Sequence, residues 1–441
     1  MKQTINSVLK EVLEKAQPPR EDVELIGNSL KSFLEKFEKS LKKLKIGAEV
    51  FVGGSYAKKT MIKKDNYDID VFVRFLNSKD NISKLTKKAL GGMSGVKMVH
   101  GSRDYFQVTI TKDVFLEVIP VVKVTKPSEA KNITDLSYSH VMYVNRKIRE
   151  KSVLDDIKLA KVFCYASNCY GAESYIHGFS GYALELLVAH YGSFLKFIRA
   201  MAKSGGHPRV YPETVSDETS TRGKIVIDIE KHYKNKLQVM MDINGSKLNS
   251  PIILVDPTYK QRNVAAALSE ETFLKFQKAC VAFLKSPSVK FFELQKIDFE
   301  KLREGAKKLG LEFVELEVKT NRQAGDIAGS KLLKFHKHLL GEIARFFQVK
   351  KEGFEYSGKK ISRGFFVVKS RGEILQEGPS ITDLKNVKKF KKEHPKAFVK
   401  NHRAYAKEKI NFSVESFLKK WATKNSKRMK EMAVVGMELG K

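Results

Sequence analysis

The chain has 441 residues, enough for two to four domains with cores of their own. It carries 82 Lys and Arg against 50 Asp and Glu, and a formal net charge of +32 opposes compactness unless a polyanion offsets it. No apolar run reaches the roughly 20 residues of a membrane-spanning helix, and the charged amphipathic start is unlike a secretory signal. We therefore expect a cytoplasmic protein that binds nucleic acid, with a membrane surface or a salt-rich cytoplasm as the competing explanations of the charge.

The first 135 residues predict helices followed by an α+β module. Apolar residues recur at helical spacing between lysines and predict helices over 1–45: Leu30, Phe33, Leu34, Phe37, Leu41 and Leu44. A tight turn at Gly53-Gly54-Ser55 precedes a short helix over Tyr56–Lys63. Runs rich in β-branched and aromatic residues predict four strands, of which the last two form a hairpin: Glu49–Val52, Asp68–Phe75, Tyr105–Ile110 and Val114–Val122.

The middle of the chain, 136–285, predicts a largely helical domain. Helices are expected over 153–200, followed by a polar loop or extended hairpin from Ser204 to Arg222. Val255–Asn263 is expected to be a loop that opens a helix over Val264–Leu284.

The segment Ser286-Pro287-Ser288 marks the next boundary, and 286–441 predicts a small α/β body with a basic tail. The body elements are a helix and three strands: Leu332–Phe347, and Glu312–Val318, Gly353–Tyr356 and Gly364–Val368. The lysine-dense run Lys385–Lys400 is either a solvated face or a contact surface for nucleic-acid phosphates. The net charge favours the phosphates.

The chemistry-bearing pattern is Gly53-Gly54-Ser55-Tyr56 followed by Asp68-Ile69-Asp70. Side chains two apart on a strand share a face, so both aspartates project together while Ile69 and its i+2 neighbours are buried on the other side. Like charges so close raise each other's pKa unless a cation lies between them. Oxygen ligation by a few carboxylates plus phosphates suits Mg²⁺.

The Gly-Gly-Ser turn opens a helix, so its backbone N–H groups and the Ser55 hydroxyl can hold a phosphate. Glu117, on the second hairpin strand, supplies a third carboxylate. A triphosphate beside a metal pair is the arrangement for nucleotidyl transfer. The competing interpretation is an N-cap turn followed by two solvated aspartates.

These motifs resemble the signature of the polymerase-β-like nucleotidyltransferases. Two further pairs of segments resemble archaeal-type (class I) CCA-adding enzymes, which extend the 3′ end of tRNA: Tyr170–Glu173 with Gly178–Tyr182, and Val255–Pro257 with Arg262–Ala265. The resemblance runs from about residue 45 to 290 and continues more weakly from Val318 to the basic tail.

The resemblance implies an α+β multidomain fold with a polymerase-β-like nucleotidyltransferase head (1–135), a helical neck that recognises the nucleotide (136–285), and a small α/β body and basic tail that bind tRNA (286–441). It implies Mg²⁺ as cofactor and CTP and ATP as substrates for addition of C-C-A to tRNA. A poly(A)-type RNA nucleotidyltransferase on the same head, and a non-catalytic tRNA-binding protein, remain the alternatives. The sequence is compatible with both a monomer and a homodimer.

The resemblance also implies residue roles. Asp68 and Asp70 would bind both metals, and Glu117 the metal that activates the primer hydroxyl. Gly54, Ser55 and Lys58 would hold the β- and γ-phosphates, and Lys161 and Tyr170 would contact the triphosphate and ribose. Ser137 and His140 would lie near the incoming nucleotide, and Arg262 would meet the base edge. The chain departs from the expected pattern at Glu117, Ser137 and Lys58, where aspartate, threonine and arginine were expected.

Each single residue has a structural alternative. Lys58 and Lys161 are on helices where lysines usually reach toward water, and His140, Tyr170 and Arg262 could be ordinary packing or surface residues. His336 and His338 diverge on a helix, so they do not predict a metal pair. The three cysteines lack metal-ligand spacing and are too few for a disulfide framework: Cys164, Cys169 and Cys280.

Overall fold

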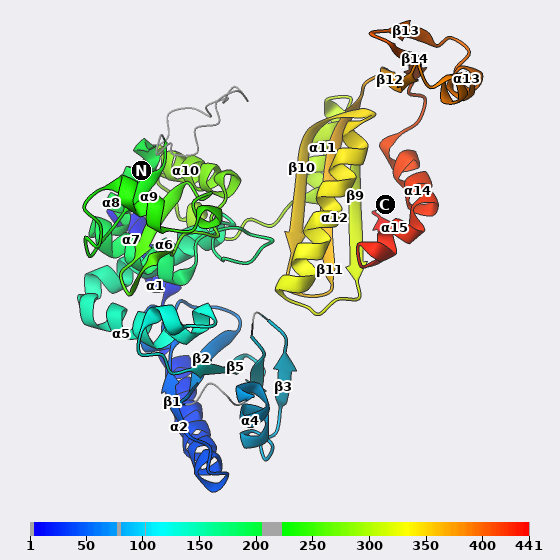
Figure 1. Ribbon diagram of the computed structural model, residues 1–441. Helices are drawn as coiled ribbons and strands as arrows, with labels where there is room; N and C mark the ends of the chain where they lie inside the picture. Colours follow the sequence, from blue (N-terminus) through cyan, green and yellow to red (C-terminus); the bar gives the residue numbers. More distant parts are fainter. Residues whose placement is uncertain (1–3, 77–80, 102, 205–222, 441) are drawn as a thin grey trace. The chain divides into compact units, whose positions relative to one another are not determined.

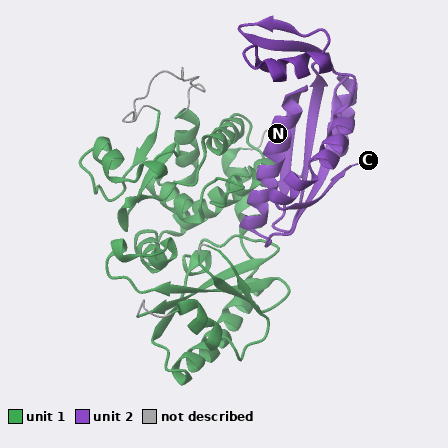
Figure 2. Cartoon of the chain, turned by 45° about the vertical axis from the view of Figure 1, so that its right-hand side comes forward, with its two compact units in different colours: residues 1–295 green, residues 296–441 purple. Residues whose placement is uncertain are grey.

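The computed structural model describes residues 4–76, 81–101, 103–204 and 223–440 (Figure 1). The chain forms two compact units, residues 1–295 and 296–441 (Figure 2). The boundary expected at 285 precedes this division by ten residues (295 − 285), and the boundary expected at 135 lies inside the first unit. Apart from Ser204, the predicted polar loop or hairpin lies outside the described residues. No helix in the described ranges is long and apolar enough to cross a membrane.

The first unit contains a head built on a five-stranded sheet of order β1-β2-β5-β4-β3. The strands are β1 (Ala48–Val52), β2 (Tyr67–Phe75), β3 (Val96–Val99), β4 (Tyr105–Thr109) and β5 (Val114–Val122). β2 and β5 pair in parallel, and the remaining neighbours pair antiparallel. The four predicted strands and the hairpin are confirmed.

One face of this sheet is covered by α2 (Arg20–Lys43) and α4 (Ile82–Ala89). The apolar stripe of α2 packs on Ile69 and its β2 neighbours, which are fully buried. The helix predicted over Tyr56–Lys63 is wrong, because α3 (Gly54–Ala57) is a single turn. The chain leaves it with Lys59 at φ +59°, and the side chains of Lys58 and Thr60 bond to the neck instead.

The neck has a separate core, rich in phenylalanine, around α6 and α7. Its helices are α1 (Ile5–Ala16), α5 (Ser137–Lys147), α6 (Lys151–Ala166), α7 (Gly181–Tyr191), α8 (Phe194–Lys203), α9 (Lys236–Asp242) and α10 (Glu270–Lys285). The short 3-10 helices of the first unit are η1 (Pro127–Glu129), η2 (Ile133–Leu136), η3 (Gly245–Lys247) and η4 (Val289–Phe292). α1 precedes the head in sequence, yet Val8 and Val12 are buried in the neck core. The three cysteines are buried there with free thiols, as expected of small hydrophobic residues.

Three predictions for the neck need correction. The helical stretch 153–200 is interrupted by a bridge between Tyr170 and Phe179, and again at Gly192, whose φ of +80° ends α7. The expected loop 255–263 is mostly strand, because β7 (Ile252–Asp256) and β8 (Tyr259–Asn263) pair beside β6 (Ile225–Ile227). The helix after it begins only at Glu270, where the Ser269 side chain accepts a hydrogen bond from the Thr272 amide.

The second unit has a four-stranded antiparallel sheet of order β10-β11-β9-β15. Its strands are β9 (Glu312–Thr320), β10 (Phe347–Tyr356), β11 (Ile361–Ser370) and β15 (Val434–Leu439). Phe366 of β11 packs with α12 and α14, whereas Phe365 packs with α11 on the opposite face. The helices are α11 (Phe299–Lys308), α12 (Asp326–Ala344), α14 (Val414–Lys424) and α15 (Ser426–Glu431). The α/β body is confirmed.

Two details of the second unit differ from expectation. The helix predicted to end at Phe347 ends at Ala344, because Phe347 begins β10 and is buried in the body core. The basic tail is folded, since it forms a small sheet and helix and the chain then returns to place β15 beside β9. The small sheet and helix are β12 (Glu373–Ser380), α13 (Leu384–Glu393), β13 (Phe398–Lys400) and β14 (Arg403–Lys409).

Candidate active site

Three carboxylates lie together on the sheet face that α2 and α4 leave uncovered. Asp70 of β2 stands directly opposite Glu117 of β5 in the parallel register, and Asp68 is two residues earlier on the same face. The intervening Ile69 is fully buried on the other face. The strand alternation therefore projects all three carboxylates toward the same side.

The three carboxylates repel one another, and this repulsion adds to the rise of the pKa values of Asp70 and Glu117. Burial, with the nearby Asp70 and Asp68 charges, raises the pKa of Glu117 to about 8. Burial also raises the pKa of Asp70 to about 6, with Asp68 adding to the rise and Lys58 opposing it. Clustered, partly dehydrated carboxylates are a donor set for a hard divalent cation.

The carboxylates fit a metal by their chemistry. By geometry alone, no group of three or more His, Cys, Asp or Glu among the described residues is arranged to hold a metal ion. The chemistry of Asp68, Asp70 and Glu117 fits Mg²⁺, since a cation would relieve the repulsion that raises their pKa values.

A glycine turn lies directly against these carboxylates. Gly54 has φ +60°, and a Cβ there would overlap the Asp70 carboxylate. A Cβ at Gly53 would overlap the Phe72 ring, and the Gly53 amide donates to the Asp70 carbonyl at 2.9 Å. Only glycine tolerates both the left-handed backbone and this close approach, so Ser55 is brought to the edge of the acidic face.

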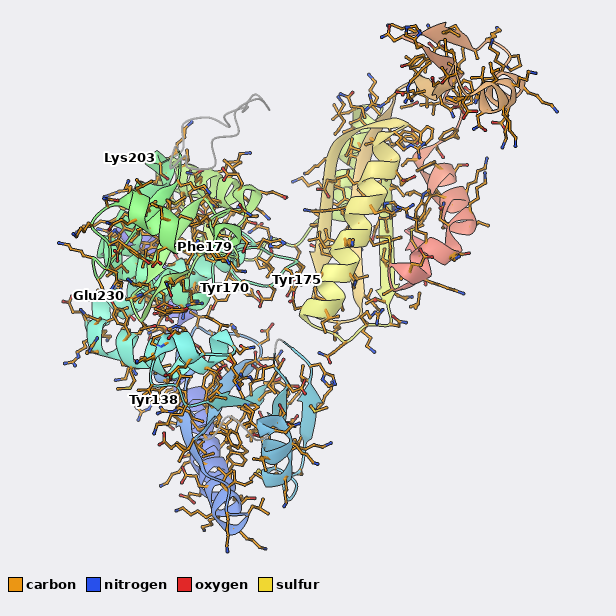
Figure 3. The ribbon with its side chains drawn as sticks, in the orientation of Figure 1. Tyr138, Tyr170, Tyr175, Phe179, Lys203 and Glu230 are labelled. Atoms are coloured by element: carbon orange, nitrogen blue, oxygen red, sulfur yellow. The ribbon has the colours of Figure 1, made fainter. Side chains whose placement is uncertain are left out.

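A small cavity opens beside the turn. Four residues of the predicted set line it: Ser55, Asp68, Lys161 and Tyr170. Tyr170 and Phe179, which share a β-bridge, are labelled in the neck in Figure 3. The cavity therefore joins head and neck residues that are more than one hundred positions apart in the sequence.

A buried charge cluster that sequence reasoning missed lies beside the cavity. Glu185 of α7, fully buried, accepts from Lys58 Nζ at 2.6 Å and from Lys161 Nζ at 2.9 Å. Thr60 Oγ1 donates to the same carboxylate at 2.8 Å and accepts from Lys161 at 2.7 Å. Two ammonium groups share one carboxylate, which leaves the cluster one positive charge in excess. The signal in the sequence was an acidic residue inside the apolar run Leu184–Val188.

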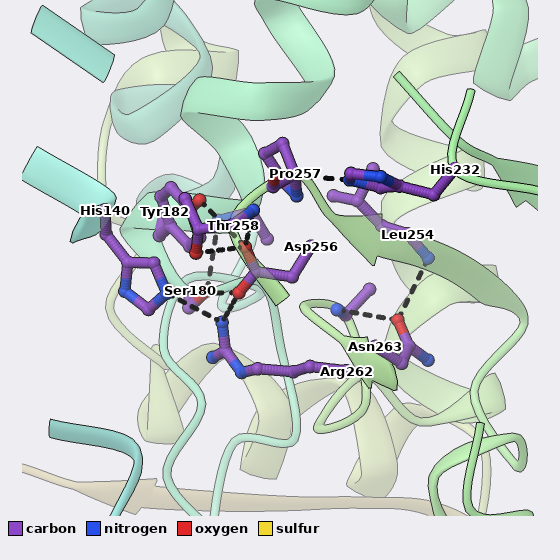
Figure 4. Close-up of polar contacts among 12 residues, drawn as sticks. His140, Ser180, Tyr182, His232, Leu254, Asp256, Pro257, Thr258, Arg262 and Asn263 are labelled. Carbon is purple, nitrogen blue, oxygen red and sulfur yellow. Dashed lines mark hydrogen bonds and ion pairs between the residues drawn. The ribbon is translucent and has the colours of Figure 1, made fainter. Parts of the chain in front are cut away.

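A second polar cluster joins α5 to the β7–β8 hairpin (Figure 4). Arg262 Nη1 donates to Asp256 Oδ2 at 2.6 Å, and His140 Nε2 lies 3.1 Å from the same oxygen. Tyr182 stacks on His140 with ring centroids 4.3 Å apart. Lys58 lies 5.7 Å from the centre of the same tyrosine ring, which links the two clusters.

The predicted residues thus fall into two connected groups. His140 and Arg262 belong to the hairpin cluster, the other predicted residues lie near the acidic face and cavity, and Ser137 is the first residue of α5, one turn before His140. Sequence reasoning assigned no role to Tyr182 or Asp256, although both lie in the segments that carry the family resemblance. The two histidines of α12 diverge as predicted, His336 toward Glu352 and His338 toward Trp421.

Comparison with known proteins identifies the family. The nucleotidyltransferase domain model matches residues 34–134, and the model for the second domain of tRNA nucleotidyltransferases matches 155–293. The CCA-adding enzyme of Nanoarchaeum equitans is 36% identical over 295 residues, which span 66% of this chain and 68% of that protein. The chain belongs to the CCA-adding enzyme family.

Other family members align over greater lengths. The CCA-adding enzyme of Methanocaldococcus jannaschii is 27% identical over 421 residues, 91% of this chain and 87% of that enzyme. Among solved structures, an RNA terminal U-transferase has a TM-score of 0.48 and 14% identity, covering 66% of this chain and 99% of its own.

Proposed function

We propose that this chain adds C-C-A to the 3′ end of tRNA from CTP and ATP by two-metal nucleotidyl transfer. In this reaction the RNA 3′ hydroxyl attacks the α-phosphate and pyrophosphate leaves. The observation that carries the proposal is the acidic face, where Asp70 and Glu117 stand in register beside the Gly54 turn. Family membership supplies the RNA substrate, since the aligned relatives are CCA-adding enzymes.

The acidic face and the turn would carry the transfer step. Asp68, Asp70 and Glu117 would hold Mg²⁺, which when bound supplies charge stabilisation to the attacking and leaving oxygens. Ser55 lines the cavity where the triphosphate would enter. Its hydroxyl and the adjoining backbone amides would orient the phosphates.

Lys161 and Lys58 would offset the charge of the triphosphate. The excess positive charge of their cluster with Glu185 lies beside the cavity and attracts a polyanion. Tyr170, in the same cavity wall, would meet the ribose. Ser137 would lie near the nucleotide, and Arg262 would present its planar guanidinium to the base edge.

The three parts of the chain would divide the work. The head (1–135) would catalyse, the neck (136–285) would recognise the nucleotide, and the body and basic tail (286–441) would bind tRNA by its shape and backbone. The buried free cysteines suit a reducing compartment such as the cytoplasm.

The test uses purified full-length chain, tRNA lacking its last three nucleotides, CTP and ATP, with sequencing of the product ends. Wild type should stop after C-C-A, whereas Asp68→Ala and Asp70→Ala should add nothing. Asp113→Ala, an exposed aspartate in the β4–β5 turn, is the matched control and should keep activity. Homopolymer tails would instead favour a poly(A)-type enzyme, and absence of Mg²⁺-dependent CTP binding would favour a non-catalytic tRNA-binding protein.

A further inference from the structure

A fully buried carboxylate, that of Asp135, lies at the junction between the head sheet and α5. Both of its oxygens accept from the Arg103 guanidinium, at 2.5 and 3.1 Å. Oδ1 also accepts from the Val122 amide at 2.8 Å, and Oδ2 accepts from the Lys131 and Asn132 amides at 3.1 and 3.0 Å. A planar two-point ion pair together with three amide bonds fixes the position of this side chain.

The bonds of Asp135 join three segments of the chain. Arg103 lies just before β4, Val122 is the last residue of β5, and Asp135 itself belongs to η2, which leads directly into α5. The Arg103 guanidinium also donates to the Pro120 carbonyl of β5 at 3.1 Å. Because β5 carries Glu117 and pairs with β4, these bonds fasten the end of the Glu117 strand to the segment that begins α5.

A second contact holds the start of α5 on the sheet face that carries the carboxylates. Arg74 follows Asp70 by four residues on β2, so both side chains project to that face, about 13 Å apart along the strand. The Arg74 guanidinium lies 4.1 Å from the centre of the Tyr138 ring, and the Phe51 ring meets the same tyrosine edge-on with centroids 5.1 Å apart. Tyr138, labelled in Figure 3, is the second residue of α5. One end of the face therefore holds the carboxylates, and the other end holds α5.

The rest of α5 contacts the neck. His140 Nε2 lies 3.1 Å from Asp256 Oδ2, and the Tyr143 hydroxyl donates to Glu230 at 2.6 Å. α5 thus spans the boundary between the residues that would hold the metal and those that would hold the nucleotide. Its position on the sheet decides how far apart these two groups of residues are.

We infer that Asp135 is a positioning residue for the transfer step. It fixes α5 against the end of β5 and thereby sets the separation between the acidic face and the neck residues that would hold the nucleotide. This inference rests on the proposed function, and Asp135 itself would touch neither the metal nor the substrates. The α-phosphate must meet the attacking hydroxyl beside the carboxylates, and a misplacement of about 1 Å caused by a remote change can lower a rate by about 100-fold.

A purely structural role for Asp135 would have a different consequence. Its carboxylate closes the capping box of η2 and its ion pair is buried, so its loss would lower Tm in either case. If stability were all that it contributes, the rate would be normal wherever the variant is folded. Rate and stability therefore have to be measured separately.

The experiment measures single additions of CTP by the full chain to tRNA lacking its last three nucleotides, at a temperature where the variants are folded. Asp135→Asn keeps the shape of the side chain but loses its charge and one acceptor oxygen. It should lower kcat by about 10- to 100-fold and change KM for CTP by less than about threefold. Ile26→Ala is the matched control, because it removes a fully buried side chain of α2 on the opposite face of the sheet. It should lower Tm but keep kcat within about twofold of wild type.

Two further variants separate positioning from folding. The double variant Arg103→Met with Asp135→Asn leaves neither partner of the buried pair charged, so Tm should recover in part while kcat stays low. Tyr138→Ala removes the ring that Arg74 and Phe51 contact and should lower kcat with little change in Tm. It carries the test if Asp135→Asn does not fold.

A readout independent of activity is the distance between spin labels at Lys87→Cys on α4 and Lys278→Cys on α10, two exposed positions in a chain whose own cysteines are buried. The distance distribution should be shifted or broadened by Asp135→Asn and unchanged by Ile26→Ala. An unchanged distance in Asp135→Asn, a kcat near that of wild type in both Asp135→Asn and Tyr138→Ala, or a kcat that recovers together with Tm in the double variant overturns the inference. A wild type that adds no CTP at all overturns the proposed function, and this inference with it.

Discussion

Replacing Glu185 with glutamine tests whether one buried carboxylate holds two lysine ammonium groups beside the cavity. Glu185 and Lys161 are almost fully buried, and the Lys58 side chain is 10% exposed. Burial lowers the pKa of Lys161, the charge of Glu185 opposes that fall, and Lys58 adds to it, so the carboxylate favours the ammonium form of this lysine. Glutamine keeps the shape but leaves two positive charges facing each other.

The size of the effect follows from this burial. Removing one partner of a buried ion pair costs about 3–5 kcal/mol, and each kcal/mol moves Tm by about 2–4 °C in a large domain, so we expect Tm to fall by roughly 6–20 °C. The double variant Lys58→Met with Glu185→Gln returns the cluster to a single positive charge. It should recover a substantial part of the stability.

The assay is thermal unfolding of the full chain, with KM for CTP measured on each variant that remains folded at the working temperature. Glu38→Gln, an exposed glutamate of α2, is the matched control and should shift Tm by less than about 2 °C. A shift of Glu185→Gln no larger than that of the control, or a double variant less stable than the single one, would refute the charge-sharing argument.

Three other perturbations test the acidic face and the folded tail. Gly54→Ala places a Cβ on the Asp70 carboxylate and should lower kcat/KM for CTP by about 100-fold or more. This loss corresponds to roughly 3 kcal/mol of steric and backbone strain. The control Gly47→Ala, which has open space around its Cβ, should leave kcat/KM unchanged. In the presence of a chelator, Tm should fall as pH rises from about 5 to 8. The folded-state pKa values, about 6 for Asp70 and about 8 for Glu117, lie above those of the unfolded chain. The stability that the protonated carboxyls contribute at low pH is therefore lost as each one ionises. Added Mg²⁺ should flatten that decline and Glu117→Gln should remove its upper part, and a Tm that is unaffected by pH would contradict the clustering. The third perturbation neutralises four exposed lysines of α13: Lys388, Lys389, Lys391 and Lys392. The dependence of tRNA affinity on salt should flatten by about 0.7–0.9 in log–log slope for each phosphate that the tail no longer neutralises. An unchanged slope would place the tRNA-binding surface elsewhere.

The head was predictable because its strands follow simple alternation. In β2 every second residue from Ile69 is apolar and fully buried, so the aspartates between them had to share the other face. The hairpin 255–263 was missed because β8 is mostly polar and half-buried or exposed, without the alternation typical of a strand. Its position is fixed by pairing with the continuously buried β7, which is a tertiary effect.

The buried charge clusters could not be predicted for a different reason. Lys58 and Lys161 each suggested an ordinary surface lysine, and only the fold brings Glu185 between them from a distant helix. In the same way, Asp256 gains its role from His140, more than one hundred residues earlier. Local sequence patterns indicate which face a side chain occupies, but they do not indicate which distant charge it meets.

The burial of α1 in the neck core makes the head a domain inserted into the neck. The chain crosses between the two twice, once after Ala16 and again between β5 and α5. Together with the buried contacts of Lys58 with Glu185 and of Lys161 with Thr60, the two linkers hold the head to the neck at several points. During synthesis, the neck residues against which α1 packs are made only after the whole head has been made. The head can therefore fold before α1 finds its place in the neck core.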